Sequence, residues 1–367
     1  RGFPGVRVAS SPHREIELAF HRMAHEHRVT YSVLPYAQGG IMLEGYAPSL
    51  RGSGERIRVT NWMDWDRRFG PLLDGSAFSD LPRAGIPLRH FVLPFSLEYP
   101  CAFRHWGTDR YAAENRAFAE EFIFHIAQRG WTEPSYFVYY SQRERCGFFP
   151  WDLDGPSGPE DADILRSLST MLRDSLHGHP GIDAGLRIDL SPIRGSQYKH
   201  ALDYFQQELI GYFDLWNIHH SAWDGSAIQA ARIAQSGEDA KVWFYLHPSV
   251  TSEPSDNTRD LPWLAFRQNS GGICFRNQPC DEYSSERTGP LRPLLYSGAK
   301  YGMHGPLPSI RLKRLRRGLQ EYELLKMAEE QKGREAASAV AEKAGGSMQA
   351  GDWDRQRTEL IELLLLP

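Results

Sequence analysis

The stretch "PSYFVYYSQRERCGFF", residues 134–149, decides the fold class because it joins a buried strand to a polar end. Residues 136–140 are all aromatic or β-branched, the types that suit a pleated sheet. Polar residues follow at once, from Ser141 to Arg145. In a barrel enzyme, the segment just past a strand's end usually holds the catalytic groups. The stretch therefore raises the question of which group this strand delivers.

Outward from this strand, short apolar runs alternate with helical patterns, which is typical of an α/β protein with a parallel sheet. Helical patterns precede several of the runs, such as residues 112–130, where Gly130 is a natural helix stop. Eight such strands predict a TIM-type (β/α)₈ barrel, which fits 367 residues with 41% hydrophobic content. The predicted strands are 28–36, 56–62, 89–95, 135–141, 186–192, 214–220, 241–248 and 271–278.

The segment after the eighth strand predicts a C-terminal helical extension. Ser309 is the expected N-cap, and Leu312, Leu315 and Leu319 fall on one helical face. Five of the seven residues 311–317 are basic, and we interpret them as a solvated helix face in preference to a binding patch. We expect a barrel of catalytic type over residues 1–306 and helices packed on it over 307–367, as one structural unit.

Composition excludes several classes of partner. The formal net charge of −4 gives no reason to expect a nucleic acid or an anionic membrane. No apolar run approaches the roughly 20 residues of a membrane span. The 10 Trp and 16 Tyr suit a carbohydrate substrate, because these side chains offer a flat apolar face with a polar handle.

Motifs for a cofactor or a metal are absent from the sequence. It has no HExxH, no GxSxG elbow and no phosphate-cradling glycine loop. His219 and His220 are adjacent, so at most one of them faces a site if the strand extends that far. We expect no cofactor and no metal.

The four cysteines form no CxxC pair. We expect free thiols; a disulfide between Cys101 and Cys146 is the alternative if the protein is exported. The chain begins at Arg1 and not at Met, which we interpret as a fragment or a processed form. A role on glycans favours export, to the periplasm or outside the cell.

Carboxylates interleaved with Trp and Tyr at the predicted strand ends point to glycoside chemistry. One carboxylic acid protonates the leaving oxygen, and another group acts as nucleophile or stabilises the cationic centre. We predict Glu144 and Glu98 as catalytic residues; the alternatives are a surface ion pair for Glu144 and a structural hydrogen bond for Glu98. The predicted substrate-binding residues are Trp62, Asp64, Asp66, Trp106, Tyr140, Gln142, Trp216, His219, Trp243 and Tyr245.

Several segments resemble glycoside hydrolase family 123 and its relatives. The segment "PSIRLKRLRRGLQEYELL" (308–325) is similar to that family's C-terminal signature. The segments "DWDRRFGPLLDGSAF" (64–78), "VWFYLHP" (242–248) and "TRDLPWLAF" (258–266) also resemble family segments, in the same order. The resemblance implies a barrel and an exo-acting β-N-acetylgalactosaminidase, in which the sugar's own acetamido group attacks the anomeric carbon.

This chain departs from that family at the catalytic position. The resemblance implies an Asp-Glu pair at the end of the fourth strand, shortly after a Gly-Trp. Gly130 and Trp131 are present, but Ser141 and Gln142 stand where the pair belongs. Neither is a general acid near neutral pH, although Gln142 can orient a substrate amide or hydroxyl.

We therefore expect a glycoside hydrolase with a different carboxylate set. The alternatives are a catalytically inactive glycan-binding barrel, a scaffold domain, or another reaction on a sugar.

Overall fold

A computed structural model describes residues 11–190, 201–219, 241–246, 258–275, 293–343 and 350–366. The chain divides into two compact units, of which the first is Arg1–Glu26 with Thr30–Val242, and the second is His27–Val29 with Trp243–Pro367. A domain boundary between residues 306 and 307 stays a prediction.

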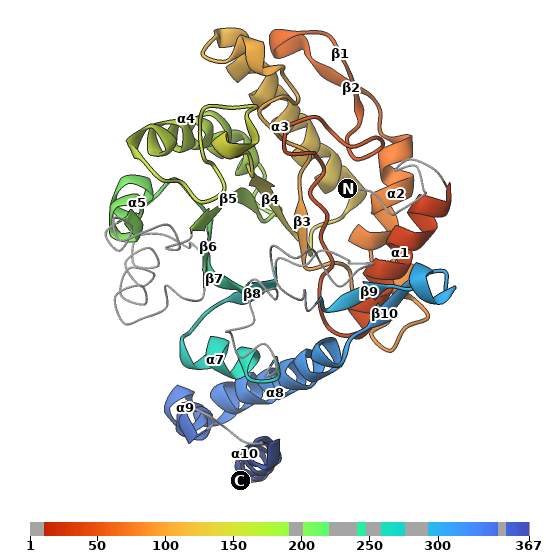
Figure 1. The fold of residues 1–367 in the computed structure, drawn as a ribbon, viewed down its shortest axis with the longest axis vertical. Coiled ribbons are helices and arrows are strands. Elements are labelled where there is room, and N and C mark those ends of the chain that lie inside the picture. Colours follow the sequence, from red (N-terminus) through yellow and green to blue (C-terminus); the bar gives the residue numbers. More distant parts are fainter. Residues whose placement is uncertain are drawn as a thin grey trace. The chain divides into compact units, whose positions relative to one another are not determined.

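The centre of the fold is a parallel sheet of six strands that curls into a half-barrel (Figure 1). The neighbours follow the chain in the order β3-β4-β5-β6-β7-β8, as expected for strands joined by crossover segments. Their bounds are β3 His90–Val92, β4 Ser135–Tyr139, β5 Ala184–Leu190, β6 Leu215–His219, β7 Lys241–Leu246 and β8 Gly272–Phe275. The α/β prediction is confirmed, and these six strands overlap the last six predicted ones.

The prediction of a closed eight-stranded barrel is wrong. The predicted strand 28–36 forms only an isolated bridge from Tyr36 to Met42. Its first residue, Arg28, has a positive φ of 64° and so is not extended. The predicted strand 56–62 contains β2, Arg58–Asn61, which pairs antiparallel with β1, Ser49–Arg51, in a separate ribbon. β2 is largely exposed, so it lacks the two buried faces of a parallel-sheet strand.

The first unit has α1 Ser11–Glu26, α2 Met63–Leu73, α3 Asp109–Arg129, α4 Pro159–Leu176 and α5 Ala201–Leu209. Short 3₁₀ turns are η1 Gly54–Arg56, η2 Ser76–Phe78, η3 Phe103–His105 and η4 Glu144–Cys146. The Thr108 hydroxyl accepts the Tyr111 N–H at the start of α3, and Gly130, with φ of 70°, ends it. The predicted stop at Gly130 is confirmed.

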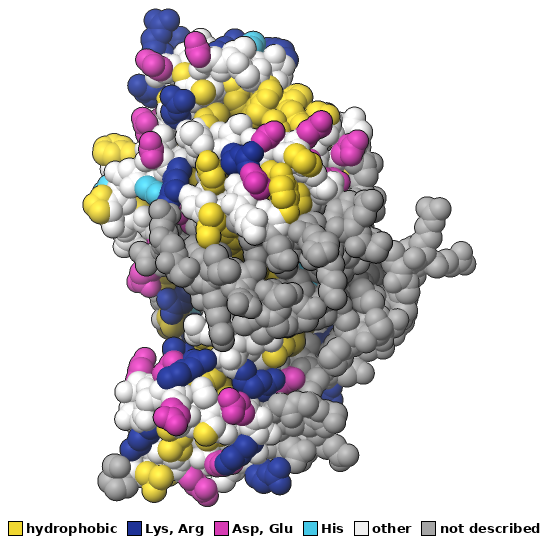
Figure 2. All heavy atoms as spheres, turned by 90° about the vertical axis from the view of Figure 1, so that its left-hand side faces the viewer, with side chains coloured by type: hydrophobic (Ala, Val, Ile, Leu, Met, Phe, Trp, Pro, Cys, Tyr) yellow, Lys and Arg dark blue, Asp and Glu magenta, His cyan; other side chains and the backbone are white. Residues whose placement is uncertain are grey.

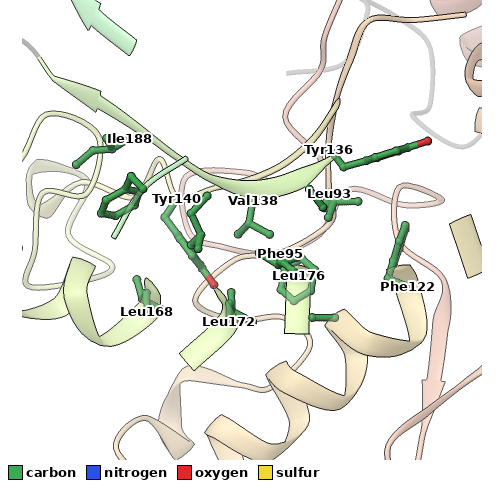
Figure 3. Packing of buried hydrophobic residues seen from close by; sticks show 14 of the residues in the cluster. Leu93, Phe95, Phe122, Tyr136, Val138, Tyr140, Leu168, Leu172, Leu176 and Ile188 are labelled. Carbon is green, nitrogen blue, oxygen red and sulfur yellow. The ribbon is translucent and has the colours of Figure 1, made fainter. Parts of the chain in front are cut away.

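The main core of the first unit lies between the sheet and its helices. Every second residue of a strand faces this core, and in β4 these are Tyr136 and Val138, with Tyr140 just beyond the strand. Figure 3 shows Val138 and Tyr140 pointing from β4 toward Leu172. The aromatic run of the opening stretch is therefore largely a packing feature, which contributes about 1.5–3 kcal/mol for each fully buried large side chain.

The second unit holds α7 Leu261–Arg267, α8 Ile310–Lys332, α9 Arg334–Lys343 and α10 Ala350–Leu365. It also contains the antiparallel ribbon of β9, Leu295–Ser297, and β10, Pro306–Pro308, with the turn η8, Ala299–Tyr301, between them. The Ser309 hydroxyl accepts the Leu312 N–H at 3.1 Å, which confirms the predicted cap of α8. Leu312 and Leu315 are buried, as their spacing predicts.

The surface shown in Figure 2 mixes basic and acidic side chains among the residues drawn in colour. Mixed signs are typical of a solvated surface and agree with the small net charge. Within the described ranges, no helix is both long and apolar enough to cross a membrane.

Candidate functional site

A group of polar side chains lies on the inner face of the sheet, the face opposite the main core. The register pairs Tyr139 of β4 with Arg187 of β5, and Asp189 of β5 with Asn217 of β6. Val138, their neighbour in β4, points into the core. Because side chains alternate along a strand, these four residues point the other way. Arg187 and Asn217 lie in the middle of β5 and β6, and Tyr139 and Asp189 lie toward the carboxyl ends of β4 and β5. That edge is where parallel α/β folds bind their ligands.

Arg187 and Asp189 form a bidentate ion pair within β5. The Arg187 Nε and Nη2 atoms donate to the two Asp189 carboxylate oxygens at 2.7 and 2.9 Å. Asp189 is fully buried, and the Arg187 guanidinium lies 4.5 Å from the centre of the Tyr139 ring. A buried carboxylate requires such a partner, because an unpaired charge is costly to desolvate. The positive charge of Arg187 also balances the negative charge of Asp189.

Asp154 is a second carboxylate of this region, linked to the Arg187–Asp189 pair through Tyr139. The Leu153 N–H donates to the Gln142 carbonyl at 2.9 Å, which folds the loop after β4 back onto the strand's end. Asp154 then accepts the Tyr139 hydroxyl at 2.8 Å and the Arg143 Nε at 2.7 Å. Tyr139 thus touches both ion pairs, through its hydroxyl and through its ring face. We call Tyr139, Arg143, Asp154, Arg187, Asp189 and Asn217 the carboxyl-edge cluster.

Two buried amides near these strand ends lack hydrogen-bond partners. Asn217 and Gln142 are both fully buried. Across the part of the chain that the structure describes, neither amide has a partner for its oxygen or its nitrogen. Buried polar atoms are nearly always paired in folded proteins, so these two are exceptions that need an explanation.

Tyr36 fixes the end of β4. Its hydroxyl donates to the Tyr139 carbonyl and accepts the Ser141 N–H at 3.0 Å. Burial raises the pKa of Tyr36 well above its usual value, so the phenol stays protonated and keeps both roles. The Tyr36 hydroxyl thus occupies the Tyr139 carbonyl and the Ser141 N–H, which a longer strand would use for sheet hydrogen bonds.

The two predicted catalytic carboxylates have different surroundings. Glu144 is exposed and begins η4, one residue after Arg143 of the cluster. Glu98 is half-buried, and its Oε2 accepts the Phe103 N–H at 3.1 Å. Its side chain also packs on Gly40, where an added Cβ would come within 3.1 Å of the Glu98 Cγ. The catalytic role of both residues stays a prediction.

Two of the predicted binding residues, Trp62 and Asp66, contact His125 near the end of α3, and a third, Asp64, pairs with Arg67 on α2. The Trp62 ring stacks on His125 with 3.9 Å between ring centres. Asp66 Oδ1 lies 2.7 Å from His125 Nε2, whereas Asp64 is exposed beside Arg67. Because α3 leads into the start of β4, this group lies near the amino end of that strand, away from the carboxyl-edge cluster.

The remaining predicted binding residues fall in several environments. His219 follows Asn217 by two positions in β6 and so shares its inner face. Trp106 packs edge-on against Tyr111 and tilted against Trp151. Tyr140 and Trp216 are buried in the main core.

The last two, Trp243 and Tyr245, lie in β7 and are buried as well. Beside the Trp243 ring stands Gly272, where an added Cβ would approach the indole to 2.8 Å.

The sequence prediction missed Asp154, Arg187 and Asp189. A usable signal was present for two of them. Arg187 and Asp189 stand two apart within the apolar run "LRIDL", and charges at such spacing share one face of a strand. Asp154 gave no comparable signal, because its place depends on how the loop after β4 folds back.

A small cavity lies elsewhere in the first unit, among α1, α2 and β3. Glu17, His21, Tyr31, Tyr46 and His90 are among the residues that line it. Its volume of about 20 Å³ is close to the space one water molecule needs, so it is far too small for a sugar ring.

Cys101 and Cys146 are free thiols, as expected, and the alternative disulfide between them is wrong. Cys101 is buried, whereas the Cys146 Sγ lies 3.0 Å from the Gln38 Oε1. Cys280 lies outside the described residues. Among the residues that are described, no group of three or more His, Cys, Asp or Glu side chains is placed to hold a metal ion.

No family model matches this chain, and no curated protein matches it either. The resemblance to glycoside hydrolase family 123 accordingly stays a prediction.

Proposed function

We propose that the protein is a glycoside hydrolase whose sugar binds at the carboxyl ends of β4, β5 and β6. The observation that supports this best is the carboxyl-edge cluster. It brings two carboxylates, Asp154 and Asp189, to one edge of the sheet and joins them through Tyr139 and Arg187. Paired carboxylates beside an aromatic ring suit the chemistry of glycosidic bond cleavage.

The ion pairs suggest how the roles divide. Asp154 and Asp189 each accept hydrogen bonds from an arginine, which favours the ionised carboxylate in both. An ionised carboxylate stabilises a cationic sugar centre but has no proton to give. The general acid must therefore be another group. Glu144 is our candidate, because it is exposed on the loop that also holds Arg143 and Asp154, and Glu98 is the proposed partner on the loop after β3.

Non-catalytic glycan binding is the second candidate function. Two observations favour it. Ser141 and Gln142 stand where the resemblance implies a catalytic pair, and arginines hold both carboxylates of the cluster. A binding site needs hydrogen-bonding groups and an aromatic surface, and it does not need a proton donor.

The test is hydrolysis of a panel of aryl glycosides and natural oligosaccharides by the purified chain. With a substrate found, we expect Glu144→Gln and Asp154→Asn each to lower kcat by about 100-fold or more. Asp174→Asn is the matched control, because Asp174 is an exposed carboxylate on α4. Thermal unfolding of each variant separates lost chemistry from lost folding.

Unchanged kcat in Glu144→Gln and Glu98→Gln would remove our assignment of the acid. Sugar binding without hydrolysis across the panel would select the second candidate.

A further inference from the structure

The Asn217 side chain lies in the middle of a strand and is buried without a hydrogen-bond partner among the described residues, which is unusual for an amide. The side chain is fully buried in β6. Of the residues that the structure describes, none provides a partner for its Oδ1 or its Nδ2. Burying an amide without hydrogen bonds costs stability, and an apolar side chain of similar shape would avoid that cost. The packing of β6 alone gives no reason for asparagine at this position.

Among the described residues, the neighbour of Asn217 in β5 belongs to an ion pair. Its register partner in β5 is Asp189, so the two side chains are neighbours on the inner face. Both oxygens of Asp189 are already bound by Arg187. Arg187 thus balances the charge of Asp189, and an anionic ligand next to Asn217 would come close to the Asp189 carboxylate.

We propose that Asn217 is a ligand-binding residue that hydrogen-bonds hydroxyl groups of a neutral sugar. The inference rests on the proposed function and names a contact of that same site. An amide offers two N–H donors and one carbonyl acceptor, and a sugar hydroxyl both donates and accepts. Ligand binding then supplies the hydrogen bonds that the protein leaves unmade. Gln142, past the end of β4, is a second fully buried amide with no hydrogen-bond partner among the described residues.

The experiment compares stability and sugar binding in Asn217→Leu. Leucine has nearly the shape of asparagine and no polar atom. We expect the midpoint of thermal unfolding without sugar to rise by about 2–4 °C, because two buried unpaired groups are removed. Calorimetric titration uses glucose, galactose, mannose, N-acetylgalactosamine and the oligosaccharides of the hydrolysis panel. For any sugar that binds the wild-type chain, we expect the variant's affinity to fall about 10-fold or more.

Ser169→Ala is the matched control. Ser169 is fully buried, and its hydroxyl donates to the Tyr212 carbonyl. Removing a hydrogen bond that is already made should lower the unfolding midpoint and leave sugar affinity unchanged. Asn217→Ala tests the same contact without adding bulk, and it applies if leucine prevents folding.

Wild-type affinity in both Asn217 variants would overturn the proposal, as would a wild-type chain that binds no sugar of the panel. Failure of the hydrolase proposal looks different. A chain that binds sugars, cleaves none, and loses binding in Asn217→Leu supports this inference and refutes hydrolysis. If the wild-type chain cleaves oligosaccharides and Asn217→Leu leaves kcat/KM unchanged, the result supports hydrolysis and refutes this inference.

Discussion

His21 on α1 should make the protein less stable at mildly acidic pH. Its side chain is 4% exposed and stands edge-on to the Tyr31 ring, with 5.2 Å between ring centres. Burial lowers the pKa of His21 from 6.5 to about 4; the nearby Glu17 opposes this shift and Arg68 adds to it. The folded protein therefore holds this imidazole neutral down to about pH 4.

The magnitude follows from the difference between the folded and unfolded chains. The unfolded chain protonates His21 near pH 6.5, and the folded chain does so only near pH 4. Stability is therefore complete above pH 6.5 and falls as the pH drops from 6.5 to 4, by about 1.4 kcal/mol per pH unit. Between pH 7.5 and 5.0 His21 alone accounts for a loss of about 2 kcal/mol. The pKa of buried His90 is also lowered to about 4, so His90 acts in the same direction.

Urea unfolding at pH 7.5 and 5.0, followed by tryptophan fluorescence, measures this loss. In His21→Phe the fall in unfolding free energy between the two pH values should be about 2 kcal/mol smaller than in the wild type. Comparing the two pH values within each variant cancels any change in packing. His304→Phe is the control, because His304 is exposed. The reasoning is refuted if His21→Phe loses as much stability on acidification as the wild type.

Three further variants test contacts that lie within one unit each. In Gly318→Ala of α8 the new Cβ would come within 2.3 Å of the Arg259 carbonyl oxygen, so we expect urea titration to show a loss of about 1–3 kcal/mol. Glu321→Gln removes the charge of a fully buried carboxylate that binds Arg259. We expect the unfolding free energy to fall by about 3 kcal/mol in the same assay. Arg187→Met leaves Asp189 buried without its cation and should cost about 3–5 kcal/mol at pH 7.5.

Exposed positions provide the controls for these variants. Gln320→Ala changes a solvent-facing residue of α8, and its unfolding free energy should stay within about 0.5 kcal/mol of the wild type. A Gly318→Ala chain as stable as Gln320→Ala would show that α8 does not approach Arg259 so closely. An Arg187→Met chain as stable as Gln320→Ala would argue against a buried ion pair at Asp189.

Most of the sheet could be predicted from the sequence, because local patterns define its strands. The apolar run through β4 predicts a buried strand without knowledge of its neighbours. The closure of the barrel could not be predicted in this way. The run 28–36 has the composition of a strand, but the positive φ of Arg28 and the hydrogen bonds of the Tyr36 hydroxyl give it another role. Composition predicts the ability to form a strand, and pairing depends on which partners the fold brings near.

The candidate site shows the same limit. The tendency of polar groups to follow strand ends directed attention to the end of β4. It also selected Trp62 and Asp66, because the segment before them was taken for a strand of the barrel. The residues that do meet at the carboxyl ends include Arg187 and Asp154, and a pattern search centred on loops passes over an arginine inside a strand.

The sequence by itself determined the parallel α/β class and several helix ends, such as Gly130 and Ser309. These features depend on the conformational preferences of a few consecutive residues, which the sequence states directly. Only the tertiary structure decided that the sheet is an open half-barrel and that Asp154 lies beside Tyr139. Contacts of that kind depend on strand register and on the path of a loop. Both are set by distant parts of the chain, because a shift of one residue in register would move Asp189 and Asn217 to the opposite face.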